Sequence, residues 1–235
     1  MTLKINNWKK LIFRVFWGIV AASLLIFFLR VVIWEDQYYK GKVGSERATA
    51  VVQDEKNEQL VETAPTEKEV KEYTVPAGNP RYLTIEKFGR YNARIVPVGV
   101  KGENNELAAP NNIYDVGWYE KSGKPGDGKT MIFDGHRGGP TEQNGIFNKL
   151  ETLAIGETIE IERGDGKIFQ YEIVENKTYP SNSADIMLDA KKSPVEGKES
   201  ISIITCVGGW DLNNQTYDSR QLVRAVFVSE VIKVK

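Results

Sequence analysis

The feature that most restricts what this chain can fold into is an uncharged apolar run near its N-terminus. The run extends from Val15 to Leu29, and with its flanks it covers residues 11–34, which is enough to cross a hydrocarbon core of ~30 Å. Basic residues precede the run and acidic residues follow it: Lys4, Lys9, Lys10 and Arg14 before, Glu35 and Asp36 after. By the positive-inside rule, we expect residues 1–10 in the cytoplasm and the chain beyond residue 35 on the outside.

Two other interpretations of this run are a cleaved signal peptide and a buried core helix. A signal peptide has a shorter apolar region followed by small residues at its cleavage site, whereas Ala21, Ala22 and Ser23 lie in the middle of this run. A helix that is apolar on all sides is buried only in the core of a large protein. We therefore expect an uncleaved, single-pass membrane anchor over residues 11–34.

Residues 35–78 differ from the anchor in composition, because charged residues, Gln, Thr and Ala dominate. Their apolar residues are scattered, so the segment cannot bury enough surface to offset the entropy lost on ordering. We expect a flexible linker, with at most a transient helix near Val51 to Lys71. A flexible coil of this length spans roughly 35–40 Å, which would hold the following domain away from the membrane.

The chain from residue 79 to residue 235 is rich in short apolar or alternating segments. Ile159 and Ile161 alternate with polar residues, a Gly-Asp-Gly turn follows at residues 164–166, and Phe169 and Tyr171 resume the alternation, which predicts a β-hairpin. Further strands are predicted at residues 82–85, 95–98, 130–133, 201–205 and 221–228, and one short helix at residues 145–153. Many short strands at regular spacing indicate an all-β sandwich or barrel.

Charge and two residue counts exclude several classes of function. The chain has 31 basic and 32 acidic residues, so it offers no general reason to expect a nucleic-acid partner. It contains one cysteine and one histidine, which excludes an intrachain disulfide and a zinc site built from several Cys and His ligands. Asp211-x-Asn213-x-Gln215 alternates oxygen ligands but lacks the glycine and distal glutamate of a calcium loop. We therefore predict no metal site and no required cofactor.

The single histidine and the single cysteine both follow predicted strands. His136 comes after strand 130–133, and Cys206 comes directly after strand 201–205; rigid strands often present catalytic side chains in this way. A thiol becomes nucleophilic beside a base such as imidazole, and a cation such as Arg220 stabilises an oxyanion. On spacing alone, a catalytic pair and an incidental buried cysteine with a loop histidine both remain open.

Strand register distinguishes Arg220 from Arg224. If strands 201–206 and 220–228 are antiparallel neighbours, Cys206 lies opposite Arg220, whereas Arg224 lies opposite Ser202. Arg224 would then be roughly 13 Å further along the strand. An oxyanion is stabilised only by a donor at hydrogen-bond distance, so we predict that Arg220 is the functional arginine.

Five short motifs resemble those of the sortase family, over residues 80 to 230 and most closely in the small D, E and F classes. The segment ending at Cys206 is similar to the family's T-L-x-T-C signature, with Ser202 and Ile203 replacing the first Thr and Leu. Asp134 departs from the pattern, because many members have a small residue before Gly-His. In chain order the motifs are Val116-Gly117-Trp118-Tyr119, Pro125-Gly126-x-Gly128, Gly135-His136-Arg137, Ile203-Ile204-Thr205-Cys206 and Arg220-Gln221-Leu222-Val223-Arg224.

This resemblance implies a closed β-barrel enzyme that cleaves an L-P-x-T-G-like sorting signal between Thr and Gly. Cys206 would form a thioacyl intermediate, His136 would act as general acid and then as base, and Arg220 would stabilise the oxyanion. Thr205 is a weaker candidate for contact with the substrate or oxyanion. The implied partners are surface proteins with a sorting signal and an amine acceptor, either lipid-linked peptidoglycan precursor or a pilin lysine.

Three alternatives remain beside this interpretation. An L,D-transpeptidase requires an arginine two residues after its cysteine, where this chain has Gly208, and an NlpC/P60-type peptidase places its cysteine before its histidine. A non-catalytic alternative is an anchored β-domain that binds cell-wall polymer, in which Cys206 is merely packed. That alternative predicts an unreactive thiol, so thiol alkylation distinguishes it from an enzyme.

Overall fold

The computed structural model describes residues 60–101, 106–213 and 216–231. The predicted anchor at residues 11–34, the preceding residues 1–10 and the first part of the linker lie outside these ranges. Within them, no helix is long and apolar enough to span a membrane.

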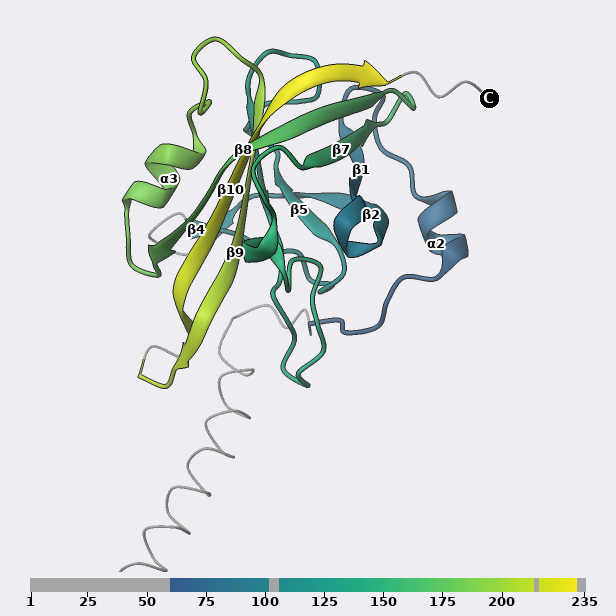
Figure 1. Ribbon diagram of the computed structural model, residues 1–235. Helices are drawn as coiled ribbons and strands as arrows, with labels where there is room; N and C mark the ends of the chain where they lie inside the picture. The colour runs from purple at the N-terminus through teal and green to yellow at the C-terminus, as the bar shows by residue number, and fades with distance from the viewer. Residues whose placement is uncertain (1–59, 102–105, 214–215, 232–235) are drawn as a thin grey trace, which may run out of the picture. The chain divides into compact units, whose positions relative to one another are not determined.

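The described chain forms a closed barrel of eight strands in the order β1-β2-β5-β6-β9-β10-β8-β7 (Figure 1). A separate antiparallel pair is formed by β3 and β4. The predicted all-β barrel is therefore confirmed. The strands are β1 (Pro80–Ile85), β2 (Arg90–Val98), β3 (Val100–Lys101), β4 (Glu106–Leu107), β5 (Val116–Tyr119), β6 (Thr130–Asp134), β7 (Thr158–Arg163), β8 (Ile168–Pro180), β9 (Ser200–Asp211) and β10 (Thr216–Val231).

Alternating apolar residues fill the barrel interior, as the sequence pattern predicts. On β7, Ile159 and Ile161 are fully buried, and antiparallel pairing with β8 places Ile161 opposite Phe169. Gly166 in the connecting turn has a φ of 85°, a left-handed conformation that glycine adopts without a steric penalty. Tyr171 and other core side chains are fully buried, and burial of one such side chain contributes about 1.5–3 kcal/mol.

A second apolar cluster lies on the outer face of β6, β9 and β10. Alternate residues of a strand point to opposite faces, so Ile132, Ile204 and Leu222 face away from the barrel interior. They pack with Ile186 and Ala190 of the short helix α3 (Asp185–Ala190), which lies beside β8 and β10 in Figure 1. This part of the barrel wall is covered on both sides, so every residue of β9 from Ser200 to Thr205 is buried.

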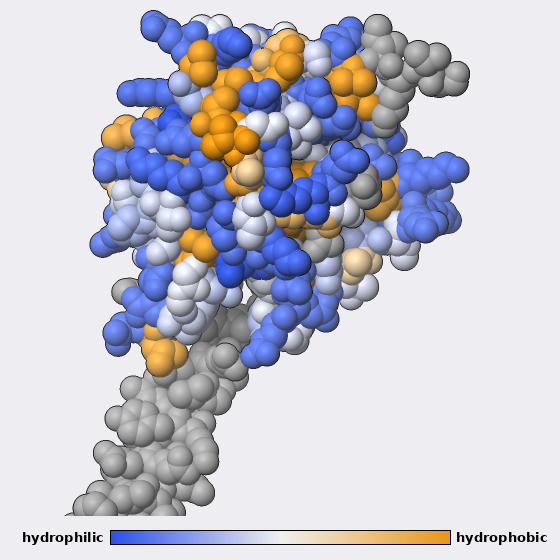
Figure 2. Space-filling model, viewed as in Figure 1, coloured by the Kyte–Doolittle hydropathy of each residue, from blue (hydrophilic) through white to orange (hydrophobic). Residues whose placement is uncertain are grey.

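Figure 2 shows a largely hydrophilic surface on one face of the protein, with separate apolar patches. One patch lies at the tip of the hairpin that connects β9 to β10, where Leu212 is 66% exposed. Inside the hairpin, the rings of Trp210 and Tyr217 pack edge to face with their centroids 5.4 Å apart. This pair stiffens the extension that follows Cys206 and precedes Arg220.

The helix content differs from the sequence prediction. The segment predicted as helix 145–153 contains only a 3-10 turn, η2 (Leu150–Thr152). The N–H groups of Leu150, Thr152 and Leu153 donate to the carbonyls three residues before them, as in a 3-10 turn, and not to carbonyls four residues before them, as in an α-helix. Helix α3 was not predicted, because six residues give too short an apolar pattern and the helix depends on packing against the outer cluster.

Residues 60–78 belong to the region assigned to a linker from the sequence, and the structure places them against the barrel. They include helix α2 (Glu67–Glu72), which begins with a capping box between Thr66 and Glu69; such a box satisfies otherwise unpaired N–H groups. The hydroxyl of Tyr73 donates to the carbonyl of Ile95, and the hydroxyl of Tyr82 donates to the carbonyl of Val70. These polar contacts order a segment that buries little apolar surface.

Candidate active site

Three strands deliver the predicted site residues to one edge of the barrel. Because β6 and β9 are parallel and pair Asp134 with Ile204, the residues that follow, including His136 and Cys206, lie at the same edge. Strand β10 is antiparallel to β9 and places Arg220 opposite Cys206 and Arg224 opposite Ser202. The predicted strand register is confirmed.

Cys206 is a free, partly buried thiol on the outer face of β9. Burial raises the pKa of this thiol, the charge of Arg220 opposes that increase, and the charge of Asp134 adds to it. The thiol is therefore protonated at neutral pH in the resting protein. A base that removes its proton is needed to make it nucleophilic.

His136 lies in the loop after β6, with its ring held by a hydrogen bond between Nε2 and the carbonyl of Pro110, 2.7 Å away. A carbonyl only accepts, so Nε2 carries a hydrogen and Nδ1 is the ring nitrogen that can accept a proton. Burial lowers the pKa of His136, although the bond to Pro110 opposes this effect. The resting imidazole is therefore neutral, and in the described structure no hydrogen bond joins it to Cys206.

Arg220 is held by the first residues of its own strand. One terminal guanidinium nitrogen donates to the carbonyls of Tyr217 and Ser219, at 2.9 and 3.0 Å, and the other donates to Thr216 Oγ1 at 2.9 Å. These bonds use three of the five N–H donors of an arginine. The main chain of the hairpin therefore fixes the position of the cation next to Cys206.

Comparison with known proteins decides the family to which this site belongs. The sequence matches the Sortase domain over residues 83–228. The chain belongs to the sortase family. A comparison with curated protein sequences found no match.

Several solved sortase structures are similar to this chain. A lid mutant of Streptococcus agalactiae sortase C1 is 20% identical, with 69% of this chain and 75% of that chain covered and a TM-score of 0.48. A Clostridium perfringens sortase D5 transpeptidase is 24% identical, with 70% and 90% covered and a TM-score of 0.45. The SrtA sortase from Actinomyces oris is 16% identical, with 75% and 89% covered and a TM-score of 0.47.

Thr205 of this sortase lies on the opposite face of β9 from Cys206. Its side chain is buried, and its hydroxyl donates to the carbonyl of Gly135 at 2.7 Å. The predicted contact of Thr205 with substrate or oxyanion finds no support in this geometry, because the hydroxyl points into the barrel. Thr205 instead ties the end of β9 to the residue that precedes His136.

Gly135 allows the histidine loop of the sortase to pack closely on the following segment. A Cβ atom at this position would lie 2.6 Å from the ring of Phe147 and 2.8 Å from Ile146, which real Cβ atoms do not tolerate. The backbone N–H of Phe147 also donates to the carbonyl of His136 at 3.0 Å. The Gly-His motif therefore has a local steric cause.

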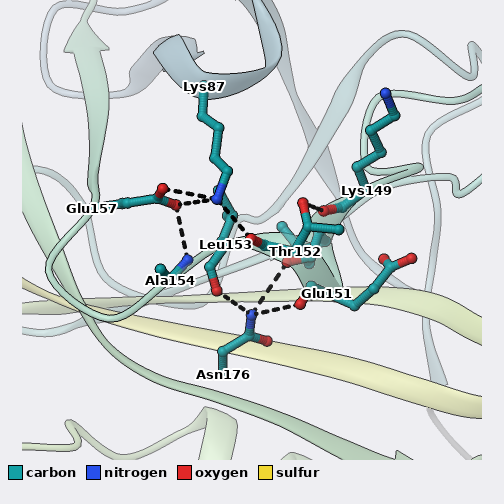
Figure 3. Close-up of polar contacts among 9 residues, drawn as sticks. Lys87, Lys149, Glu151, Thr152, Leu153, Ala154, Glu157 and Asn176 are labelled. Atoms are coloured by element: carbon teal, nitrogen blue, oxygen red, sulfur yellow. Dashed lines mark hydrogen bonds and ion pairs between the residues drawn. The ribbon is translucent and has the colours of Figure 1, made fainter.

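The η2 turn is bound to strand β8 by the side chain of Asn176 (Figure 3). Asn176 of β8 donates to the carbonyls of Leu150, Glu151 and Leu153 through its side-chain nitrogen. Glu151 in turn pairs with Arg137, which follows His136, at 3.1 Å. This network connects the rigid β8 strand to the loop that carries the histidine.

Asp134 is the charged residue of the site that the sequence analysis did not assign a role. Burial raises the pKa of its carboxyl group to about 7, and the charges of Arg220 and Lys101 oppose this increase. The same Lys101 contributes to the lowered pKa of His136. The signal in the sequence was the departure of Asp134 from the family motif.

The described part of the sortase contains no group of three or more His, Cys, Asp or Glu residues that could hold a metal ion. The segment that begins Asp211-x-Asn213 forms the turn after β9, where the backbone N–H of Asn213 donates to Asp211 Oδ1 at 2.8 Å. Gln215 lies outside the described residues.

Proposed function

We propose that this sortase is a cysteine transpeptidase in which Cys206 is the nucleophile, His136 the acid/base and Arg220 the oxyanion-stabilising cation. The observation that carries the proposal is that the single cysteine of the chain lies opposite Arg220, and that the single histidine follows the neighbouring parallel strand at the same edge of the barrel. The order of these residues along the chain agrees with the family motifs.

The first step of the proposed reaction is attack of Cys206 on the scissile carbonyl. His136 Nδ1 accepts the thiol proton, while Nε2–H remains bonded to Pro110 and stabilises the imidazolium. The thiolate sulfur forms a bond to the carbonyl carbon, and Arg220 stabilises the negative charge on the oxygen. When the tetrahedral intermediate collapses, the imidazolium gives its proton to the leaving amine and a thioester remains on Cys206.

The second step is attack of an incoming amine on this thioester. The imidazole accepts a proton from the amine, the new amide bond forms, and the thiolate of Cys206 leaves and is reprotonated by His136. Since the resting thiol and imidazole are both uncharged, the reactive ion pair is a minor form of the free enzyme. The reaction requires no cofactor.

The proposed substrate is an L-P-x-T-G-like sorting signal that is cleaved between Thr and Gly. The outer face that carries Cys206 offers apolar side chains for contact with the Leu and Pro of such a peptide. Partly buried Leu107, Tyr119 and Met187 pack against the second apolar cluster on this face. The proposed acceptors are the amine of lipid-linked peptidoglycan precursor or a pilin lysine. We further propose that residues 11–34 anchor the enzyme in the cell membrane, with the barrel outside the cell.

The test is to incubate the full chain in detergent with a panel of sorting-signal peptides and to search by mass spectrometry for an acyl adduct on Cys206. The expected result is an adduct whose mass equals the peptide part up to Thr. Thiol alkylation of the same protein provides the control for accessibility. A thiol that neither acylates nor alkylates would refute the proposal and support a non-catalytic domain that binds cell-wall polymer.

A further inference from the structure

Residues 61–63, here called the clamp segment, join the N-terminal part of the chain to two loops of the barrel. The backbone N–H of Val61 donates to the carbonyl of Asn111 at 2.8 Å, and the N–H of Ile113 donates to the carbonyl of Val61 at 3.0 Å. The side-chain nitrogen of Asn112 donates to the carbonyl of Thr63 at 3.0 Å. The clamp segment is therefore bound along its length to the loop at residues 110–113.

Glu62 binds the second loop, which contains residues 138–144. Its carboxylate accepts hydrogen bonds from the backbone N–H of Thr141 at 3.1 Å and from Thr141 Oγ1 at 2.7 Å. A Cβ atom on Gly139 would lie 1.9 Å from Glu62 Oε1. The close approach of this carboxylate thus depends on a glycine in the loop.

Both loops hold His136. The first loop contains Pro110, whose carbonyl accepts the hydrogen bond from Nε2 of the ring. The second loop continues directly from His136 and returns to it, because the N–H of Gly145 donates to the carbonyl of Arg137 at 2.9 Å. The clamp segment therefore connects the residue that orients the imidazole to the loop that carries it.

The clamp segment contributes little to the apolar core. Val61 is 43% exposed, and Glu62 is only partly buried. Removal of these polar contacts should therefore loosen the two loops without unfolding the barrel, whose core is made by other residues. This separates an effect on the site from an effect on overall stability.

We propose that Glu62 is a positioning residue for His136, so that the clamp segment, which precedes the barrel in the chain, supports the active site. The expected effect on the reaction rate rests on the proposed transpeptidase function. The expected effect on the position of the imidazole does not, because the ring of His136 can be observed whether or not the protein catalyses a reaction. A displacement of about 1 Å at a reacting group can reduce a rate a hundredfold, so a loosened loop should be visible in the kinetics.

The test compares Glu62→Ala with Glu67→Ala in the full chain. Glu67 is an exposed acidic residue of α2, only five positions away, and among the described residues it forms no hydrogen bond or ion pair with either loop. The first measurement is the rate of acylation of Cys206 by a sorting-signal peptide. We expect kcat/KM to fall about tenfold in Glu62→Ala and to remain at the wild-type value in Glu67→Ala.

The second measurement is an NMR titration of the imidazole, which is unambiguous because the chain has one histidine. Burial is the main cause of the lowered pKa of His136, so a loosened loop that admits water should raise that pKa in Glu62→Ala. Glu62→Gln keeps one acceptor oxygen for Thr141 and should restore part of both effects. A urea unfolding curve of each variant separates loop loosening from unfolding.

The proposal is overturned if the His136 pKa of Glu62→Ala equals that of Glu67→Ala, or if the pKa changes only together with the unfolding midpoint. If Glu62→Ala does not fold, Thr141→Val takes its place, because it removes the hydroxyl donor to Glu62 and leaves the carboxylate in position. Absence of acylation in the wild-type protein would refute the transpeptidase function alone, since the titration still tests the position of His136.

Discussion

Separate replacement of Arg220 and Arg224 by alanine distinguishes a chemical role from a structural one on the same strand. Arg220 lies opposite Cys206, and Arg224 lies opposite Ser202, about 13 Å further along β10. Their partners also differ. Arg220 is bound to the main chain of its hairpin, whereas Arg224 is paired with Glu175 and donates to the carbonyl of Asp189.

The expected magnitudes follow from these positions. Arg220→Ala removes the cation beside the developing oxyanion, so kcat/KM should fall at least ~100-fold, about 2.7 kcal/mol of transition-state stabilisation. Arg224→Ala leaves Glu175 without its partner in a pair whose side chains are only 12% and 26% exposed. We expect it to lower the free energy of unfolding by about 1–3 kcal/mol and to change kcat/KM by less than ~10-fold.

The assay measures acylation of Cys206 by a sorting-signal peptide with quenched mass spectrometry, and urea unfolding of the same preparations. Arg220→Lys is a useful control, because it retains the charge but loses the planar set of donors, and it should lie between wild type and Arg220→Ala in rate. If Arg224→Ala were the slower enzyme, the assignment of the oxyanion site to the Arg220 end of β10 would be refuted.

Three further predictions concern the nucleophile, the buried carboxyl group and the membrane topology. Cys206→Ala should abolish acylation and transpeptidation but leave the unfolding curve almost unchanged. Residual turnover above ~1% of the wild-type rate would show that Cys206 is not the sole nucleophile. Burial raises the Asp134 pKa from its ordinary value near 3.8 to about 7, so the folded state holds a proton that the unfolded chain has lost; stability should fall as pH rises from about 4 to 7. In urea unfolding measured at several pH values, Asp134→Asn should show a smaller decrease in the free energy of unfolding with pH, and it should be more stable than wild type by at least about 1 kcal/mol above pH 7. The same pH dependence in both proteins would contradict the assignment to Asp134. Protease added to intact cells should degrade the chain beyond residue 35 and leave a fragment that contains residues 1–34, whereas protection of the whole chain would contradict the anchor.

The strands and the position of Cys206 opposite Arg220 could be predicted from the sequence because both depend on local patterns. Side chains alternate along a strand with a period of two, so Ile159 and Ile161 identified β7 without reference to the rest of the chain. Two strands joined by a short connection pair as antiparallel neighbours, and this sets the register of β9 and β10 near their turn. The capping box of Thr66 and Glu69 was an equally local signal for α2, although the sequence analysis expected only a transient helix there.

The surroundings of His136 were decided by the tertiary structure alone. Pro110, which orients its ring, is 26 residues away in sequence, and Glu62 and Thr141 are 79 residues apart. Thr205 faces Gly135 because β6 and β9 are parallel neighbours, a pairing that joins distant segments. Helix α3 is six residues long, and a helix of that length is not stable by itself. Such contacts form only when the closed barrel brings loops from different strands together, so no local pattern of residues encodes them.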